Sequence, residues 1–205
     1  MTIKAAFSAS HLLKPASFTS SSPNASLNTL EMYLDYACPF CLKIFERWTE
    51  GGLFDEKFLS ENNLQIRFNN VPQPWHLRSI PIHNVGLAVG RYKPDAFWKY
   101  SLQLFKDAKE TWNDNLNGNT PDEFNKILVE HAHKHTGVDK TLIEDYLGEK
   151  NSGTRMADIK YFVRYHRTTG AHVTPSIAIN GIFVSSIESS TDLDKVIDII
   201  KQQTI

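Results

Sequence analysis

The chain has 205 residues, of which 41% are hydrophobic, and its 22 basic and 23 acidic side chains give a formal net charge of −1. This composition excludes an intrinsically disordered chain, and no apolar run reaches the roughly 18 residues that span a bilayer. The sequence has no Lys/Arg-rich clusters, so neither nucleic acid nor a membrane is expected as a partner. The length suits one globular domain, or one domain with an insertion.

The first 26 residues are predicted to form a loose lead-in, because they contain seven serines and no acidic side chain. Their apolar stretch from Ala5 to Leu13 is interrupted by Ser8, Ser10 and His11, unlike the continuous apolar segment of a secretory signal. Secretion is therefore not expected. The pattern favours a cytoplasmic protein, with a mitochondrial presequence as the alternative because the segment is basic and acid-poor.

A strand, a helix and a second strand are predicted next. Residues 30–36 alternate between apolar and polar side chains, residues 42–48 have apolar side chains at helical spacing, and residues 64–68 alternate again. Pro39 falls in the first turn of the predicted helix, where proline is favoured. The usual right-handed crossover makes this a βαβ unit with parallel strands.

The following hundred residues are predicted to be mostly helical. After a loop marked by Pro72, Pro74 and Pro81, helical patterns cover residues 85–92, 94–111, 121–135, 139–147 and 154–167. The Asn180-Gly181 dipeptide between two apolar runs then predicts a β-hairpin, followed by a helix that begins at residue 190 or 191.

The fold class is therefore α/β, in the order βαβ, a helical insertion and ββα. Residues 27–71 and 170–205 are predicted to form one domain, and residues 72–169 the insertion.

Cys38 and Cys41 are the only cysteines of the chain, and they close a loop too small to staple a domain. Either the two cysteines form a reactive pair, or they are inert core residues that have this spacing by chance. At the start of a helix, the macrodipole and unpaired N–H groups favour the thiolate of Cys38. Cys41 lies one turn further on. We predict that Cys38 is the nucleophile and that Cys41 resolves the mixed disulfide.

The Thr174-Pro175 dipeptide stands immediately before an apolar strand. Such a proline can simply mark the edge of a strand. We favour a cis bond in a turn that faces the cysteines and presents backbone groups to an extended substrate. Pro39 and Phe40, between the cysteines, are predicted to contact the same substrate.

These motifs resemble the thioredoxin superfamily, over roughly residues 27–203. The strand that leads into Cys-Pro-Phe-Cys, the Thr-Pro before a later strand, the Asn-Gly hairpin and the C-terminal helix carry the resemblance, and the helical insertion is similar to the DsbA-like branch. The segments 35–41, 73–76 and 172–176 look like those of eukaryotic, notably fungal, DsbA-like proteins. The resemblance implies a thioredoxin-like fold and thiol-disulfide oxidoreductase activity on protein or small-molecule thiols and disulfides.

The dipeptide between the cysteines departs from the Pro-His of oxidising DsbA proteins and resembles glutaredoxins instead. Without the histidine, we expect a weaker oxidant than bacterial DsbA. No bound cofactor and no metal are expected, and glutathione is a candidate redox partner. Two alternatives stay open, namely a glutathione-dependent transferase similar to the kappa class and a non-catalytic module that binds an extended peptide. The sequence does not indicate an oligomeric state.

Glu31 and Asp35 precede the cysteines on the predicted strand. A carboxylate beneath the active site can accept the proton of the resolving thiol, so both are candidates for a proton relay, with Asp35 ahead because it is nearer in sequence. The alternative is an ordinary solvated acid at the end of a strand.

Trp75 and His76, with His83, follow the second strand. They are candidates to line a groove beside Cys38, because ligand sites favour the carboxyl ends of parallel strands; helix capping and packing are the alternative.

His131 and His135 have the i, i+4 spacing of a metal pair, but no HExxH motif accompanies them. Histidines also suit the C-terminal end of a helix, so we expect these two and His133 to be solvated surface residues.

Overall fold

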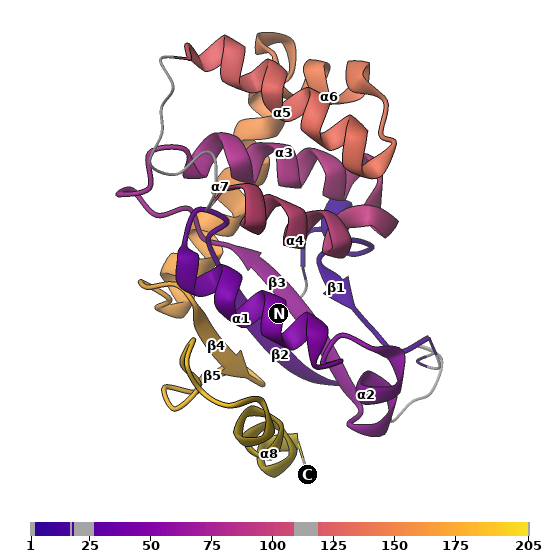
Figure 1. Ribbon diagram of the computed structural model, residues 1–205, viewed down its shortest axis with the longest axis vertical. Coiled ribbons are helices and arrows are strands. Elements are labelled where there is room, and N and C mark those ends of the chain that lie inside the picture. The colour runs from indigo at the N-terminus through magenta and orange to yellow at the C-terminus, as the bar shows by residue number, and fades with distance from the viewer. Residues whose placement is uncertain (1–2, 17, 19–26, 109–118, 205) are drawn as a thin grey trace.

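The computed structural model describes residues 3–16, 18, 27–108 and 119–204. A five-stranded mixed sheet lies at its centre, with the strand order β1-β3-β2-β4-β5 (Figure 1). As predicted, β2 (Asn28–Leu34) pairs in parallel with β3 (Leu64–Asn70). On its other side β2 pairs antiparallel with β4 (Ser176–Ile179). The central strand β2 therefore ends between two neighbours, directly before the cysteines.

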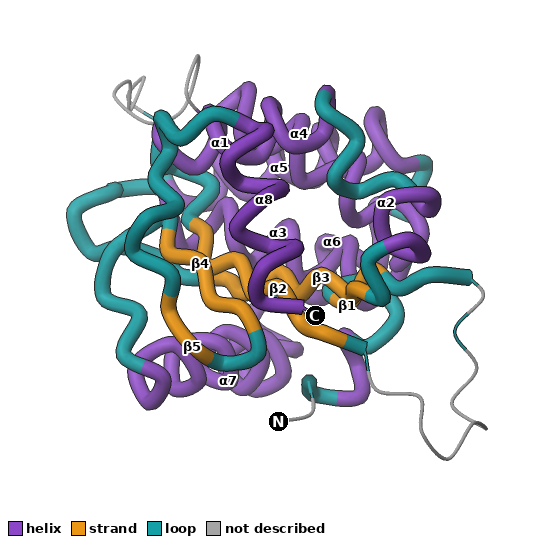
Figure 2. The backbone as a smooth tube through the Cα atoms, turned by 90° about the horizontal axis from the view of Figure 1, so that it is seen from below, coloured by secondary structure: helices purple, strands orange, loops and turns teal. Residues whose placement is uncertain are grey.

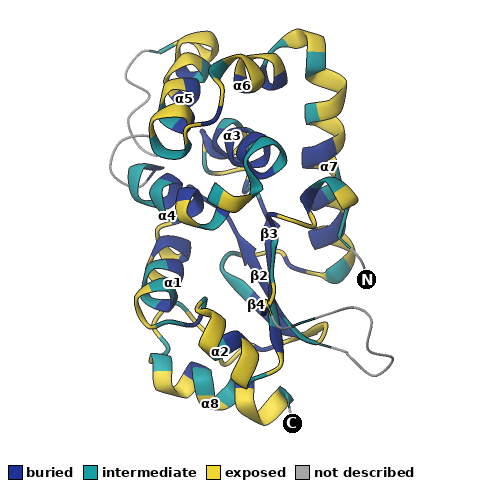
Figure 3. Cartoon of the chain, turned by 90° about the vertical axis from the view of Figure 1, so that its right-hand side faces the viewer, coloured by how far each residue is buried: buried dark blue, intermediate teal, exposed yellow. Residues whose placement is uncertain are grey.

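α1 (Pro39–Glu50) forms because its apolar side chains recur at helical spacing and are buried against the sheet. Pro39 occupies the first helical position, where its missing N–H costs nothing. α7 (Ser152–Thr169) covers the opposite side of the sheet, as Figure 3 shows. A short helix, α2 (Glu56–Glu61), precedes β3 and was not predicted, because six residues carry too little periodicity.

Between β3 and β4 the described elements are all helical, and Figure 1 shows most of them beyond one end of the sheet, while the last of them, α7, leads back to it. They are α3 (Ser79–Tyr92), η2 (Pro94–Ala96), α4 (Phe97–Asp107), α5 (Pro121–Thr136), α6 (Lys140–Leu147), η4 (Glu149–Asn151) and α7. Among the helices described, none combines the length and the apolar character needed to cross a membrane.

α3 begins six residues before the predicted start, so the loop expected through Pro81 was wrong. Pro81 lies in the first turn of α3, where backbone N–H groups have no helical partner and proline is tolerated.

The prediction of a loose lead-in was also wrong for the described N-terminal residues. The turn η1 (Ala5–Phe7) buries Phe7 completely against the ring of Phe162. β1 (Leu12–Leu13) then pairs antiparallel with β3 and covers that edge of the sheet. Composition could not reveal this, since the segment is ordered by pairing with a strand some 50 residues away. The remaining lead-in residues lie outside the described ranges.

The predicted hairpin joins β4 to β5 (Ile182–Phe183). Asn180 and Gly181 have φ values of 52° and 82°, as a two-residue turn with both central residues at positive φ requires. α8 (Leu193–Thr204) starts slightly later than predicted and lies on the same side of the sheet as α1 (Figure 2).

Candidate active site

Cys38 stands at the N-terminal end of α1, with its thiol turned toward the Thr174-Pro175 turn. The residue is 5% exposed, and its sulfur lies 3.4 Å from the Thr174 carbonyl oxygen, to which it donates when the thiol is protonated. A hydrogen bond from the Cys41 thiol, helped by the backbone N–H groups of Cys41 and Phe40, outweighs burial and lowers the pKa of Cys38 to about 6. At neutral pH, Cys38 is therefore mainly a thiolate.

Cys41 lies one turn further along α1 and is completely buried. Its sulfur accepts a hydrogen bond from the Asp35 backbone N–H at 3.5 Å. Burial raises the pKa of Cys41 well above its ordinary value, and the neighbouring Cys38 raises it further. One thiol of the pair is thus ionised while the other keeps its proton, which is the division that an attacking and a resolving thiol require.

The Thr174–Pro175 peptide bond is cis, and the turn that contains it forms one wall of a groove of about 720 Å³. Phe40 also lines this groove, together with Phe183 and Val184. The side chain of Phe40 is 59% exposed, so an apolar surface is open to solvent directly beside the cysteine pair.

The side chain of Asp35 is fully buried below the start of α1. From the described residues its carboxylate accepts five hydrogen bonds, which come from Ala37 N (3.0 Å), Ser79 Oγ (2.7 Å) and His83 Nε2 (3.2 Å) to Oδ1, and from Gln73 N (2.8 Å) and His76 Nδ1 (2.8 Å) to Oδ2. Burial alone would raise its pKa, but the hydrogen bonds from the two histidines hold that pKa well below its usual range. Asp35 is therefore an ion throughout the neutral range.

A chain of buried polar groups leads from this carboxylate to the N-terminal segment. The amide nitrogen of Asn70 donates to His83 Nδ1 at 2.8 Å, and the amide oxygen of Asn70 accepts from His11 Nε2 at 2.9 Å. His11 Nδ1 accepts from the hydroxyl of Ser10 at 2.8 Å. Because burial lowers the pKa of His11 to about 3, this ring is neutral. Each hydrogen bond in this series of polar groups is therefore donated in the direction of Asp35.

Glu31 is not brought to the cysteines. Its carboxylate lies on the α7 side of the sheet, where it accepts hydrogen bonds from the hydroxyls of Tyr33 at 2.9 Å and Tyr165 at 2.6 Å. α1, which carries the cysteines, is on the other side (Figure 3). Glu31 and Asp35 share one strand pattern but not one environment, because the chain turns after Leu34.

Trp75 and His76 are near the site in different ways. His76 belongs to the Asp35 cluster through its Nδ1 atom, whereas Trp75 is 61% exposed with its ring against that of His76. Ser79 was missed by sequence reasoning. Its spacing of four from His83 at the start of α3 is the signal that places both side chains on one helix face.

The expectation of solvated histidines at the end of α5 was wrong for His131. Its side chain is only 10% exposed and is hydrogen-bonded to Asp107. His133 is exposed, and its Nδ1 atom contacts the carbonyl oxygen of Val138 at 2.8 Å.

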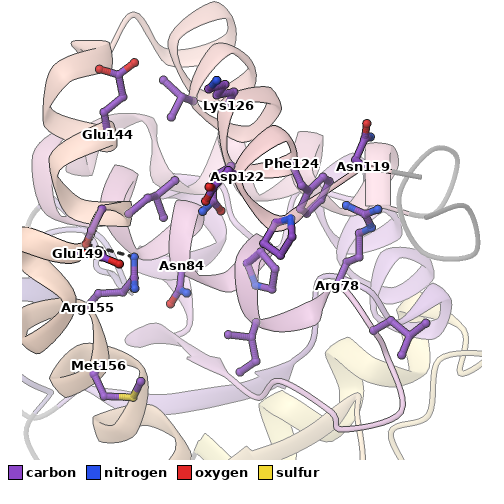
Figure 4. A pocket seen from close by; sticks show the side chains of 18 residues that line it. Arg78, Asn84, Asn119, Asp122, Phe124, Lys126, Glu144, Glu149, Arg155 and Met156 are labelled. Carbon is purple, nitrogen blue, oxygen red and sulfur yellow. Dashed lines mark hydrogen bonds between the residues drawn. The ribbon is translucent and has the colours of Figure 1, made fainter. Parts of the chain in front are cut away.

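A second cavity, of about 760 Å³, lies among the helices away from the cysteines (Figure 4). Its lining carries both signs of charge, with the basic residues Arg78, Lys126 and Arg155 and the acidic residues Asp122, Glu144 and Glu149. The guanidinium of Arg78 stacks on the ring of Phe124 at 4.0 Å. The groove beside Phe40 is the one next to the thiols, because its lining includes Thr174, whose carbonyl oxygen contacts Cys38, whereas the described lining of the second cavity includes neither Thr174 nor a cysteine.

A family model described as Thioredoxin matches residues 22–199. The chain belongs to the thioredoxin family. This match confirms the predicted family, and the sheet with its helical layers confirms the predicted thioredoxin-like α/β fold. The match spans both halves of the sheet and the helices between them, so the thioredoxin family accounts for the strands and for the helix that holds the cysteine pair.

Solved structures share the fold at low sequence identity. Oxidised BdbD from Bacillus subtilis aligns with a TM-score of 0.68 and 19% identity, covering 96% of this chain and 93% of its own. The reduced disulfide bond oxidoreductase DsbG from Mycobacterium tuberculosis aligns with a TM-score of 0.66 and 21% identity, covering 94% and 86%. A periplasmic thioredoxin-like protein from Salmonella enterica serovar Typhimurium aligns with a TM-score of 0.63 and 16% identity, covering 100% and 99%.

Among curated protein sequences, none is similar enough to count as a relative. The similar structures overturn the expected cytoplasmic location, since they include a periplasmic protein and point away from the cytoplasm. That expectation depended on the character of the N-terminal residues. A Cys-X-X-Cys pair on this fold also occurs in compartments where disulfides persist, so the character of those residues does not decide the compartment.

Proposed function

We propose that this thioredoxin-family protein is a thiol-disulfide oxidoreductase in which Cys38 attacks and Cys41 resolves. The observation that carries the proposal is the contrast between the two thiols. Cys38 is ionised at the open end of α1 beside a groove, whereas Cys41 is protonated and buried one turn below it. The family and the oxidoreductase-like fold support the same activity.

In the reductive direction, the Cys38 thiolate attacks one sulfur of a substrate disulfide. A mixed disulfide forms, and the other substrate sulfur leaves as a thiolate. The negative charge beside Cys41 disappears in this step, which removes one of the causes that raise the pKa of Cys41. Cys41 then passes its proton to the released substrate thiolate or to water, and attacks the sulfur of Cys38. The Cys38–Cys41 disulfide forms, and the second substrate thiolate is released, so the substrate gains two electrons and the protein loses two.

The turn at Thr174 and Pro175 is proposed to hold the substrate. The Thr174 carbonyl oxygen faces Cys38 and is free to accept an N–H of an extended substrate when Cys38 is a thiolate or has formed the mixed disulfide. Pro39 and Phe40 are proposed to contact the same substrate, and the exposed ring of Phe40, which lines the groove, suits apolar substrate side chains. Glutathione is a candidate reductant that returns the pair to the dithiol.

Asp35 is proposed to act on Cys41 through position and charge. A carboxylate with a lowered pKa and five donors is a weak base, which makes direct acceptance of the Cys41 proton unfavourable. Its backbone N–H contacts the Cys41 sulfur, and its carboxylate fixes the backbone of Ala37 and Gln73 on either side of the site. The carboxylate thus holds the turn that presents both thiols.

Trapping of the mixed disulfide tests this assignment. Incubation of the Cys41→Ser variant with insulin should give a covalent complex through Cys38 that thiol reductants dissolve, whereas the Cys38→Ser variant should give none. Exchange activity retained by Cys38→Ser would contradict the proposal. If wild-type protein shows no exchange while the doubly substituted Cys38→Ser, Cys41→Ser variant binds glutathione saturably, the transferase alternative is favoured. The absence of both exchange and glutathione binding would favour a peptide-binding module.

A further inference from the structure

The C-terminal end of α4 and the last turns of α5 bring together three groups that bind metals. His131 and His135 lie one helical turn apart on α5, and Asp107 is the last residue of α4. One ligand atom from each residue lies within 4.8 Å of the other two, and all three residues are half-buried. The rings of the two histidines are 4.5 Å apart between centroids, so both face the same space.

Neighbouring residues hold these groups in place. His131 Nε2 is 2.6 Å from Asp107 Oδ2, and its other ring nitrogen, Nδ1, is 3.1 Å from the hydroxyl of Tyr100. Gln103 donates to the same carboxylate oxygen of Asp107 at 2.8 Å. An outer partner on the far nitrogen of a histidine fixes the ring and directs the nearer nitrogen inward, as in protein metal sites.

The charge of Asp107 also favours a cation at this position. The Asp107 side chain is 26% exposed, and a partly buried carboxylate is stabilised by a cation close to it. The amide of Gln103, which donates to the same carboxylate, carries no charge.

We propose that Asp107, His131 and His135 form a binding site for a divalent transition-metal ion, with Zn²⁺ as the expected occupant. Two imidazole nitrogens and one carboxylate oxygen, with water in the fourth position, are a usual zinc ligand set. Mg²⁺ and Ca²⁺ prefer sites made wholly of oxygen ligands, so this donor set disfavours them.

Metal binding requires only small movements of the side chains. Ligand distances of about 2.0–2.1 Å in a tetrahedral site place neighbouring ligand atoms about 3.3 Å apart. Asp107 and His131 therefore move slightly apart from their 2.6 Å contact, and His135 closes on them. The proton that His131 Nε2 shares with Asp107 moves to Nδ1, which then donates to the Tyr100 hydroxyl. The ion would tie the end of α4 to α5.

Zinc titration of the full chain tests the site, and it must be performed without the cysteines, because the Cys38–Cys41 pair can itself bind zinc. Calorimetric titration of the Cys38→Ser, Cys41→Ser variant with ZnCl₂ should show one ion per chain. In that background Asp107→Asn and His135→Gln should each weaken zinc binding more than about 10-fold, since even outer partners of metal ligands contribute 10–100-fold. His133→Gln is the matched control, because His133 is a neighbouring histidine outside the cluster and should leave the affinity unchanged.

Thermal unfolding supplies a second readout that does not depend on heat of binding. Zinc at about 100 times its Kd should raise the Tm by about 5–10 °C, and at the same zinc concentration Asp107→Asn should reduce this rise to about half or less while circular dichroism shows the fold intact. Absence of zinc binding, or equal affinity in the Asp107→Asn, His135→Gln and His133→Gln variants, would overturn the proposal.

Discussion

Replacing Cys41 with alanine is expected to raise the pKa of Cys38 from about 6 into the range of about 7 to 8. The hydrogen bond from the Cys41 thiol is the largest cause of the lowered pKa of Cys38. A hydrogen bond to a charged group contributes about 1.5–3 kcal/mol, and 1.36 kcal/mol corresponds to one pKa unit. Its loss should therefore reduce the thiolate fraction of Cys38 at pH 7 from about nine-tenths to between about one-half and one-tenth.

The Cys41→Ser variant is the matched control. Serine keeps a hydroxyl donor near the position of the Cys41 thiol, so the pKa of Cys38 should stay close to about 6. The ultraviolet absorbance of the thiolate, followed against pH, measures this pKa in both variants, and the pH profile of alkylation by iodoacetamide supplies an independent value. Each variant contains Cys38 as its single thiol, so the signals need no separation.

Equal pKa values for Cys38 in the alanine and serine variants would refute this reasoning. If both remained near about 6, the backbone N–H groups at the start of α1 alone would stabilise the thiolate. If both rose by the same amount, the serine hydroxyl would not act as a donor to the Cys38 thiolate. The lowered pKa of Cys38 would then require a thiol at position 41.

Asp35→Asn is expected to lower the free energy of unfolding at pH 7 by about 2–4 kcal/mol, because buried donors lose their anionic acceptor. The pKa of Asp35 is lower in the folded chain than its unfolded value of about 3.9, so the stabilisation is present above that pH and fades below about pH 4. If the difference in free energy of unfolding between wild type and Asp35→Asn, measured with urea, did not shrink in acid, this account would be contradicted. Phe7→Ala should lower the free energy of unfolding by about 3–5 kcal/mol in the same assay, whereas Ile182→Ala, at a residue 71% exposed, should lower it little. Equally small losses in both variants would mean that the N-terminal segment is loosely attached, as the sequence had suggested. Phe40→His adds a donor beside Cys38. A fall of its pKa from about 6 to about 5 would make the pair more oxidising by about 30 mV at pH 7, and an unchanged or lower potential in glutathione buffers would show that residue 40 does not act on the thiolate.

The strands and long helices follow from local pattern and were therefore predictable. β2, α1 and β3 have clear alternation or helical spacing, and the Asn180-Gly181 turn has a specific backbone requirement. The N-terminal segment was not predictable, because β1 has only two residues and exists through its pairing with β3. A Ser-rich composition is equally compatible with a segment that wraps the edge of a sheet.

The active site divides in the same way. The spacing of Cys38 and Cys41 and their place before a helix indicated the chemistry directly. Asp35 was a candidate by position alone, while its donors come from residues up to 48 positions away that only the folded chain brings together. Glu31 has the same place in the alternating pattern as Asp35, but its carboxylate lies on the α7 side of the sheet. Side-chain alternation predicts which face a residue takes within a strand, but not where the strand ends.

The dithiol–disulfide equilibrium of Cys38 and Cys41 in glutathione redox buffers, with free thiols counted by mass-shifting alkylation, tests the central claim most directly. A thiolate pKa of about 6 lies between those of thioredoxin, about 7, and DsbA, about 3.5. The account predicts a reversible two-electron transition, lost in Cys38→Ser and in Cys41→Ser, at about −200 to −270 mV. A midpoint near about −120 mV would contradict the weaker oxidant described above, and the absence of a Cys38–Cys41 disulfide at every buffer ratio would contradict the redox function itself.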